Sequence, residues 1–321
     1  MINRNVSMEN CFRNYLQTEQ IEKKGIREIA LLLLAVEKMY QATQDDNYKS
    51  YVIDKLDKLI TEKGTLSEED KVNSDSLDQY LFGNAVFFAV KYSEDQKYTD
   101  YVKALAAKMA EQSRLEDGVF TSVAGDMTKT NRQILAGAYA TQVFYMNYES
   151  KFGGKEHYND IIAQFNSLRA DYYDKVVGNM PESEEALAFY LCSLIDTMEV
   201  MEQPLYEIFR RLQDLYKETY KVLRENGMAA KEENSTTAAF EAYAVLKGCR
   251  MKALQTEKYE AKAEQIVLDK IQYAEEQSPK LATEMSEDAT YTAAVMMSYA
   301  EGIRNREYQD YGRGKGGALW S

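Results

Sequence analysis

The chain has 321 residues and a formal net charge of −13, with 45% hydrophobic and 28% charged residues. This composition supports a packed globular core, and the negative charge argues against nucleic acid or an anionic membrane surface as the main partner. The longest apolar run, "IALLLLAV" at 29–36, is too short to cross a bilayer and no signal peptide precedes it, so we expect a cytoplasmic protein.

Helices are predicted along the whole chain, because only 3 prolines interrupt a sequence rich in Leu, Ala, Glu, Lys and Met. Hydrophobic periodicity predicts about twelve of them. In chain order they span residues 8–23, 27–43, 47–62, 77–92, 97–113, 131–150, 157–170, 184–201, 204–224, 236–253, 257–277 and 287–304.

A short signal opens alternate helices: a few polar residues, a tyrosine and then an amphipathic stretch. Because the turns before these tyrosines are short, consecutive helices should form antiparallel hairpins, with each tyrosine ring packed under its turn. The signal recurs about every fifty residues, at Tyr48, Tyr98, Tyr158, Tyr206, Tyr259 and Tyr308.

The composition of alternate helices predicts how the hairpins assemble. One set is rich in small residues, as in "LAGAYATQVF" and "TTAAFEAYAVL", whereas the other is charged on one face, as in "YEAKAEQIVLDKI". A helix that is apolar all round is buried on all sides. We therefore predict an all-α fold, an (α/α)6 barrel over residues 1–306 with a tail at 307–321; an open solenoid is the alternative.

Long links lead into the small-residue helices, at 63–76, 114–130, 171–183, 225–235 and 278–286. Long loops at one end of a rigid scaffold commonly build a functional site. We therefore place the candidate site at the mouth formed by the N-termini of the inner helices, where helix dipoles favour anions.

Several kinds of site are not indicated. The three cysteines form no CxxC pair, and the single histidine, His157, is expected in a turn away from the mouth. Neither a catalytic triad nor a zinc site is therefore predicted, and no phosphate-binding glycine motif occurs. We expect no metal and no cofactor. The tail "GRGKGGALWS" follows no strand, so it is not expected to bind phosphate.

Carboxylates are plentiful in the predicted mouth loops. Asp78 lies in the first turn of the first small-residue helix that follows a long loop, where Ser76 can cap the helix. Such an acid commonly just complements the helix dipole. Two carboxylates can also hydrolyse a glycosidic bond; the sequence does not single out one pair, and Asp78 with Asp126 or Asp288 is a candidate.

The stretch "SLDQYLFGNAVFFAVKYSEDQKYTDYVKALAAKMAEQSRLEDGVFTS" (76–122) resembles the second hairpin of glycoside hydrolase families 88 and 105, the unsaturated glucuronyl and rhamnogalacturonyl hydrolases. "TNRQILAGAYATQVFYMNYESKF", "LCSLIDTMEVM" and "NSTTAAFEAYAVLKGCR" resemble later stretches, in the family's order. The resemblance implies the same (α/α)6 barrel. The positions that match the family's pattern in the first stretch are Asp78, Gly83, Tyr98, Arg114, Gly118 and Phe120.

The catalytic residues that the resemblance implies are mostly absent. The family's aspartic acid in a WLDG motif, which hydrates the double bond of an unsaturated uronic sugar, is matched by Ala136, and the preceding Trp by Ile134. Its RGNGW stretch matches residues 185–189, "EALAF", and its FWH matches residues 120–122, "FTS". Among the positions that match the family's site acids, only Asp78 is still an acid. Loss of a general acid slows such a reaction by roughly 10²–10⁴-fold.

Three functions follow as hypotheses. The first is a catalytically impaired carbohydrate-binding relative, and the second is a hydrolase of unsaturated uronic-acid oligosaccharides with a rearranged acid pair. The third is a structural protein whose mouth is filled by its own side chains. Asp78 is the candidate catalytic residue, and Lys129, Arg132 and Arg114 could offset the negative charge of the protein toward a uronate. The expected substrate-binding residues are Asp126, Asn131, Arg132, Gln133 and Asp288.

Overall fold

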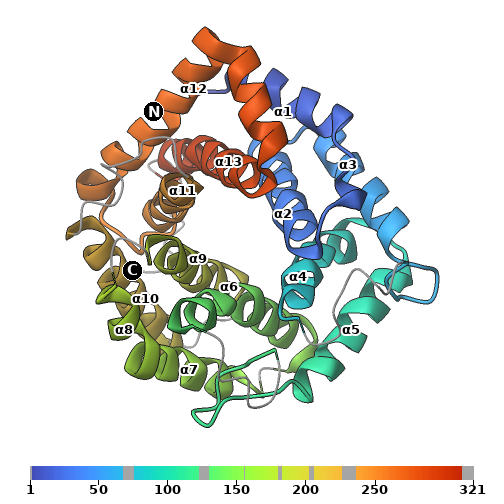
Figure 1. Cartoon of the computed structure of the whole chain (residues 1–321), viewed down its shortest axis with the longest axis vertical. Helices are drawn as coiled ribbons and strands as arrows, with labels where there is room; N and C mark the ends of the chain where they lie inside the picture. The colour runs from blue at the N-terminus through green and yellow to red at the C-terminus, as the bar shows by residue number, and fades with distance from the viewer. Residues whose placement is uncertain are drawn as a thin grey trace.

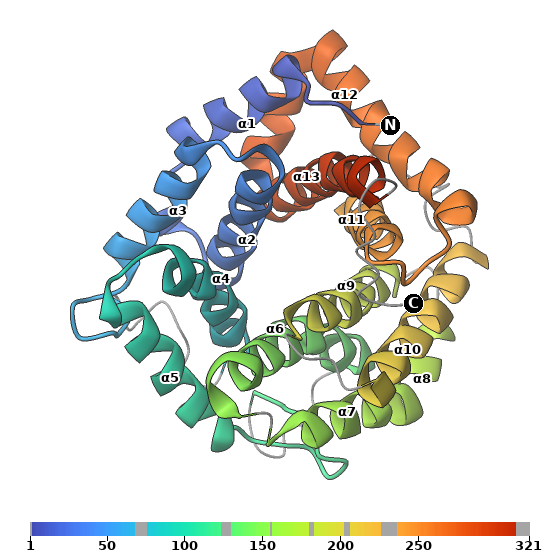
Figure 2. The ribbon, with the colours of Figure 1, turned by 180° about the vertical axis from the view of Figure 1, so that it is seen from behind.

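The computed structural model describes residues 2–67, 76–122, 130–154, 156–179, 183–201, 206–225 and 236–312. Within these ranges the helices form an inner ring and an outer ring around a common axis (Figure 1, and from behind in Figure 2). The inner ring consists of α2 (Ile26–Thr43), α4 (Asp78–Tyr92), α6 (Asn131–Tyr148), α9 (Glu184–Val200), α11 (Thr236–Arg250) and α13 (Ala289–Gly312). The outer ring consists of α1 (Val6–Thr18), α3 (Asp46–Leu59), α5 (Gln96–Ala110), α7 (Tyr158–Ser167), α8 (Asp174–Val177), α10 (Tyr206–Glu225) and α12 (Thr256–Glu287).

The inner ring is closed. Each inner helix packs on the next one in chain order, and α13 packs on α2, so the last helix returns to the first. An open solenoid would leave those two helices apart. The predicted (α/α)6 barrel is therefore confirmed, and the solenoid alternative is wrong.

Burial explains why the two sets of helices separate. Every residue of α9 from Ala186 to Met198 is buried, which requires neighbours on all sides. In α10, by contrast, Ile208, Leu212 and Leu215 are buried on one face, at the spacing of an amphipathic helix. The core thus lies between the rings and inside the inner one. None of the described helices is long and apolar enough to cross a membrane.

The repeated tyrosines support the hairpin turns in part. Tyr48, Tyr98 and Tyr158 are buried, as predicted. The phenol of Tyr98 donates a hydrogen bond of 2.5 Å to Asp57 on the neighbouring outer helix α3. Tyr206 is 69% exposed, so the prediction is wrong there. Tyr206 is the first residue of α10, and its ring lies on the solvent side of the helix.

The predicted limits of two helices are too short. The link expected at 278–286 is helical, because α12 continues to Glu287 after a break at Gln277 (φ −135°, ψ 37°). Pro279 follows this break, and proline is tolerated in a first turn, where no N–H donor is needed. Helix α13 runs to Gly312, beyond its expected end at 304. Part of the link expected at 171–183 is also helical, in η4 (Leu168–Tyr173, a π-helix) and α8.

Small residues in the inner helices serve two different purposes. A Cβ atom added to Gly83 would lie 2.3 Å from Leu105 Cδ2 and 2.8 Å from Phe144 Cε2, so glycine is needed for close packing there. A Cβ atom added to Gly137 would meet only Leu77, at 3.3 Å. Close packing therefore does not explain Gly137, because this glycine borders an open space.

Candidate functional site

That open space is a cavity of about 710 Å³ at the mouth, around the N-terminal halves of four inner helices. Its volume is within the usual range for small-molecule sites. Helix α2 contributes Arg27 to its lining, and helix α9 contributes Glu185, Ala186 and Phe189. Helix α4 and the residues before it contribute Ser76, Leu77, Asp78 and Leu81. Helix α6 and the residues before it contribute Ser122, Thr130, Arg132, Gln133, Ala136, Gly137, Tyr139 and Ala140.

The start of α6 forms the largest part of the lining. Thr130 caps this helix: its hydroxyl accepts a hydrogen bond of 3.3 Å from the backbone N–H of Gln133, and the Gln133 side chain accepts one of 3.0 Å from the backbone N–H of Thr130. This capping box fixes the first turn. Helical spacing then places Gln133, Ala136, Gly137 and Ala140 on one face toward the cavity.

Ala136 is half-buried and faces this cavity, as its match to the catalytic acid of the resembling family implies. Its methyl group contributes no proton donor or acceptor. The inner helices on either side of α6 each supply one carboxylate to the lining, Asp78 from α4 and Glu185 from α9. The cavity thus has acids on both sides of a position that has none.

Asp78 is half-buried in the first turn of α4. Its backbone N–H donates a hydrogen bond of 3.3 Å to the Ser76 hydroxyl, which in turn donates one of 3.4 Å to the Asp78 carboxylate. The carboxylate therefore keeps acceptor capacity for a ligand, while the helix dipole favours its charge. Glu185 is exposed in the first turn of α9.

Aromatic rings lie deeper in the mouth. The Phe189 and Tyr139 rings are 5.8 Å apart at their centroids. The guanidinium carbon of Arg27 lies 5.0 Å from the centroid of the Phe189 ring, so Arg27 reaches from α2 toward α9 across the barrel. Together with Arg132 it gives the lining two cationic groups beside the two carboxylates. Arginine side chains of this kind bind carboxylates through charge-assisted hydrogen bonds.

Arg27 was missed by the sequence prediction. It is the second residue of α2 and, together with Glu28, directly precedes the apolar run "IALLLLAV". A cation at the mouth end of an inner helix is the signal that could have identified it.

The other predicted site residues have different positions. Arg132 and Gln133 line the cavity with Asp78, whereas Asn131, although next to them, does not contribute to the lining. Asp288 is exposed and caps α13 by accepting a hydrogen bond of 2.9 Å from the Tyr291 backbone N–H, so it also lies outside this lining. Asp126 and Lys129 fall outside the described residues.

Two further polar residues are engaged elsewhere. Arg114, expected near the mouth, forms two hydrogen bonds of 2.8 and 2.7 Å with Asp160 and contributes nothing to the cavity lining. This pairing raises the pKa of Arg114, while burial opposes the shift. His157 lies at the other end of the barrel, with Nδ1 3.0 Å from Glu149. In the described ranges, no group of three or more His, Cys, Asp or Glu residues is arranged to hold a metal ion.

Comparison with known proteins agrees with this architecture. The family model described as Glycosyl Hydrolase Family 88 matches residues 10–180. A glycoside hydrolase from family 105 of C. acetobutylicum ATCC 824 superposes with a TM-score of 0.74 at 18% identity, over 95% of this chain and 99% of that one. A glycosyl hydrolase of family 88 from Bacteroides vulgatus gives a TM-score of 0.71 at 9% identity, over 93% and 97%. None of the curated protein sequences matches the chain.

Proposed function

The chain belongs to glycosyl hydrolase family 88, and we propose that its mouth cavity binds a uronic-acid oligosaccharide without hydrating it efficiently. The observation that carries the proposal is the position of Ala136. It lines the cavity between Asp78 and Glu185, at the position where the sequence resemblance calls for the acid that protonates the double bond. A methyl group there leaves room for a sugar and provides no proton.

The chemistry of the lining supports a carboxylated sugar as the ligand. Arg27 and Arg132 can pair with the uronate carboxylate, and charge-assisted hydrogen bonds of this kind contribute about 1.5–3 kcal/mol each. Phe189 and Tyr139, which are both buried, form an apolar part of the lining. The cavity of about 710 Å³ also counts against the hypothesis of a structural protein whose mouth is filled.

A second candidate function is hydrolysis by a rearranged acid pair. Asp78 and Glu185 both line the cavity and approach it from different inner helices, which favours this pair over one that includes Asp288. In such an enzyme one carboxylic acid would protonate the leaving group while the other carboxylate activates water or attacks the sugar.

A turnover assay separates the two functions. Unsaturated uronyl disaccharides prepared from pectin, hyaluronan and heparin are incubated with the wild type and with Asp78→Asn, Glu185→Gln and Ala136→Asp, and loss of the ultraviolet absorbance of the double bond is followed. We expect no turnover by the wild type and a gain of about 10²-fold over background in Ala136→Asp, from the restored general acid.

Clear wild-type turnover that is abolished by Asp78→Asn would overturn the impaired-relative proposal. If Glu185→Gln abolished it as well, the rearranged pair would be supported. Far-UV circular dichroism of each variant shows whether a loss reflects unfolding rather than chemistry.

A further inference from the structure

The barrel has a second cavity, of about 460 Å³, at the end opposite the mouth. It lies near the C-terminal ends of the inner helices, and each of the six inner helices contributes at least one residue to its lining. Tyr139 lines both cavities and therefore stands between them. Helix C-termini favour cations, and several lysine and arginine side chains gather here.

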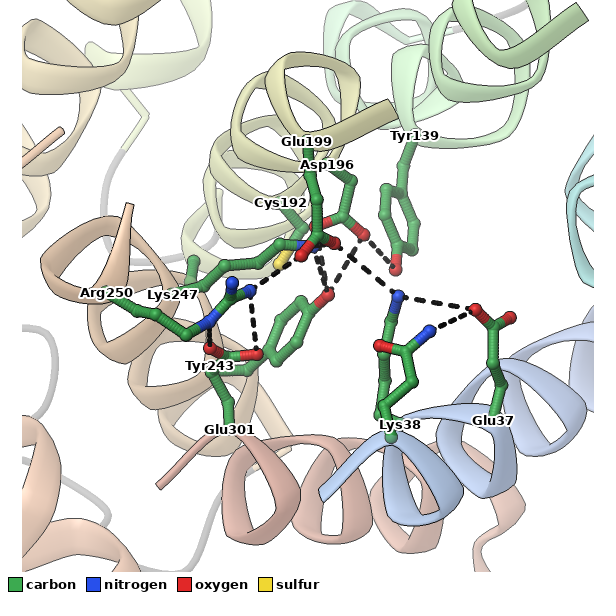
Figure 3. Close-up of polar contacts among 12 residues, drawn as sticks. Glu37, Lys38, Tyr139, Cys192, Asp196, Glu199, Tyr243, Lys247, Arg250 and Glu301 are labelled. Carbon is green, nitrogen blue, oxygen red and sulfur yellow. Dashed lines mark hydrogen bonds and ion pairs between the residues drawn. The ribbon is translucent and has the colours of Figure 1, made fainter. Parts of the chain in front are cut away.

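A network of ion pairs forms one wall of this cavity (Figure 3). Glu199 on α9 pairs with Lys247 and, at 2.6 Å, with Arg250, both from α11. Burial opposes the charge of Glu199, but these cations outweigh it and hold its pKa well below the usual range. Asp196 accepts hydrogen bonds of 2.7 Å from Lys247 and 2.9 Å from the Tyr243 phenol. The carboxylates of this wall are therefore already well paired.

Lys38, on α2, is not paired in the same way. The residue is only 8% exposed and lines the cavity. Its ammonium nitrogen lies 3.8 Å from Glu37 and 3.7 Å from Glu199, which is beyond hydrogen-bond distance. Burial opposes its charge, yet these carboxylates raise the pKa of Lys38, so the side chain stays cationic.

Lys38 therefore has unfilled donors. In the described part of the chain its ammonium group makes ion pairs but no hydrogen bond, although it carries three N–H donors. A buried cation is costly unless its donors find acceptors. Because Lys38 borders the cavity, an acceptor can reach it from there.

The lining as a whole carries an excess of positive charge. Five cations face three carboxylates, which gives a local charge of +2 (five minus three) in a chain whose net charge is −13. The cations are Lys38, Lys91, Lys151, Lys247 and Arg304, and the carboxylates are Glu37, Asp196 and Glu199.

One side of the cavity is aromatic. Phe87, Phe88 and Tyr92 come from α4, and the ammonium of the exposed Lys91 lies 4.9 Å from the centroid of the Tyr92 ring. The exposed Lys151 lies 5.9 Å from the centroid of Phe87. Cations thus stand beside ring faces at the opening. Amide groups lie further in, as with Asn147, whose Oδ1 atom is buried and has no hydrogen-bond partner among the described residues.

We propose that this second cavity binds a small anionic sugar, a sugar carboxylate or a sugar phosphate, whose acid group accepts hydrogen bonds from Lys38. The sugar ring lies along the aromatic side formed by α4, and Lys91 and Lys151 attract the anion to the opening. The site is separate from the mouth, and its ligand does not depend on the function proposed there.

The test is a calorimetric titration of the full chain with galacturonate, glucose 6-phosphate, galactose and inorganic phosphate. It is done in an Arg132→Gln background, so that weak binding at the mouth is suppressed. We expect both anionic sugars to bind at one site, and Lys38→Met to weaken that binding by about tenfold or more, equivalent to about 1.4 kcal/mol. Neutral galactose should bind at least about tenfold more weakly than galacturonate.

A second variant tests the proposal without replacing a buried residue, so misfolding is not a concern. Lys91→Gln combined with Lys151→Gln changes only exposed side chains, and it should weaken binding by about threefold and reduce its salt dependence, because screening acts on exposed charges. The proposal is overturned if neither anionic sugar binds at tens of millimolar, or if Lys38→Met leaves the affinity unchanged. Inorganic phosphate that binds as tightly as glucose 6-phosphate would overturn the role of the sugar ring.

Discussion

The buried carboxyl group of Glu241, on the inner helix α11, gives a stability prediction whose size can be worked out. Glu241 is 3% exposed, and its Oε2 atom has no hydrogen-bond partner in the described ranges. Burial raises its pKa from the ordinary 4.5 to about 7; Lys262 opposes the shift and Glu184 adds to it. In Glu241→Gln a neutral side chain of the same shape replaces this group, so the cost of a buried charge disappears.

Proton linkage determines whether the stability of the folded protein rises or falls with pH. The pKa of Glu241 is higher in the folded state, so the folded protein binds more protons between about pH 4.5 and pH 7, and wild-type stability falls across that window and then levels off. A pKa difference of that size corresponds to about 3 kcal/mol at pH 8, about 2 kcal/mol at pH 6 and less than about 1 kcal/mol at pH 5.

Urea unfolding followed by far-UV circular dichroism at pH 5, 6 and 8 measures this effect. Glu241→Gln should unfold at a higher urea concentration than the wild type at pH 8, and the advantage should shrink toward pH 5. The exposed Glu207→Gln is the matched control and should show no pH-dependent difference. The prediction would be contradicted if Glu241→Gln stabilised the protein equally at pH 5 and pH 8, or if the variant were less stable than the wild type at pH 8.

The remaining predictions concern packing, the buried ion pairs and the mouth. Gly83→Ala should lower the free energy of unfolding by about 1–3 kcal/mol because of the clash with Leu105, whereas Gly137→Ala should cost less than about 1 kcal/mol; thermal unfolding of both variants compares them, and equal losses would contradict the packing argument. Glu199→Gln should cost about 3–5 kcal/mol in urea unfolding, since it leaves buried cations without their shared carboxylate, and an unchanged midpoint would contradict this. Arg27→Gln should weaken calorimetric binding of an unsaturated uronyl disaccharide by about tenfold without changing the melting temperature, and unchanged affinity would remove Arg27 from the site.

Much of the fold could be predicted from local sequence. Small-residue helices such as α9 cannot be stable with a solvent-exposed face, so their alternation with one-sided helices such as α10 predicts an inner and an outer ring. The ends of helices were harder to predict. The sequence predicts Pro279 in a link, but a proline after a break can start a new helical segment, as it does within α12.

The candidate site was predicted less completely. The family resemblance, which matches Ala136 to a catalytic position, implies that this residue faces the mouth. The contribution of Arg27 depends on a contact from α2 to Phe189 of α9, residues that are 162 positions apart (189 minus 27), and no local pattern encodes such a contact. The same holds for the cations around Glu199, which come from different inner helices and meet only when the ring closes.

According to the proposed function, the mouth binds a uronic-acid oligosaccharide and releases it without chemical change. The most direct measurement is a calorimetric titration of the wild type with an unsaturated uronyl disaccharide, followed by recovery of the sugar and mass analysis. We expect saturable binding at one site, weakened by Arg27→Gln, with the double bond of the recovered sugar intact. Absence of binding, or recovery of a hydrated and cleaved sugar, would contradict it.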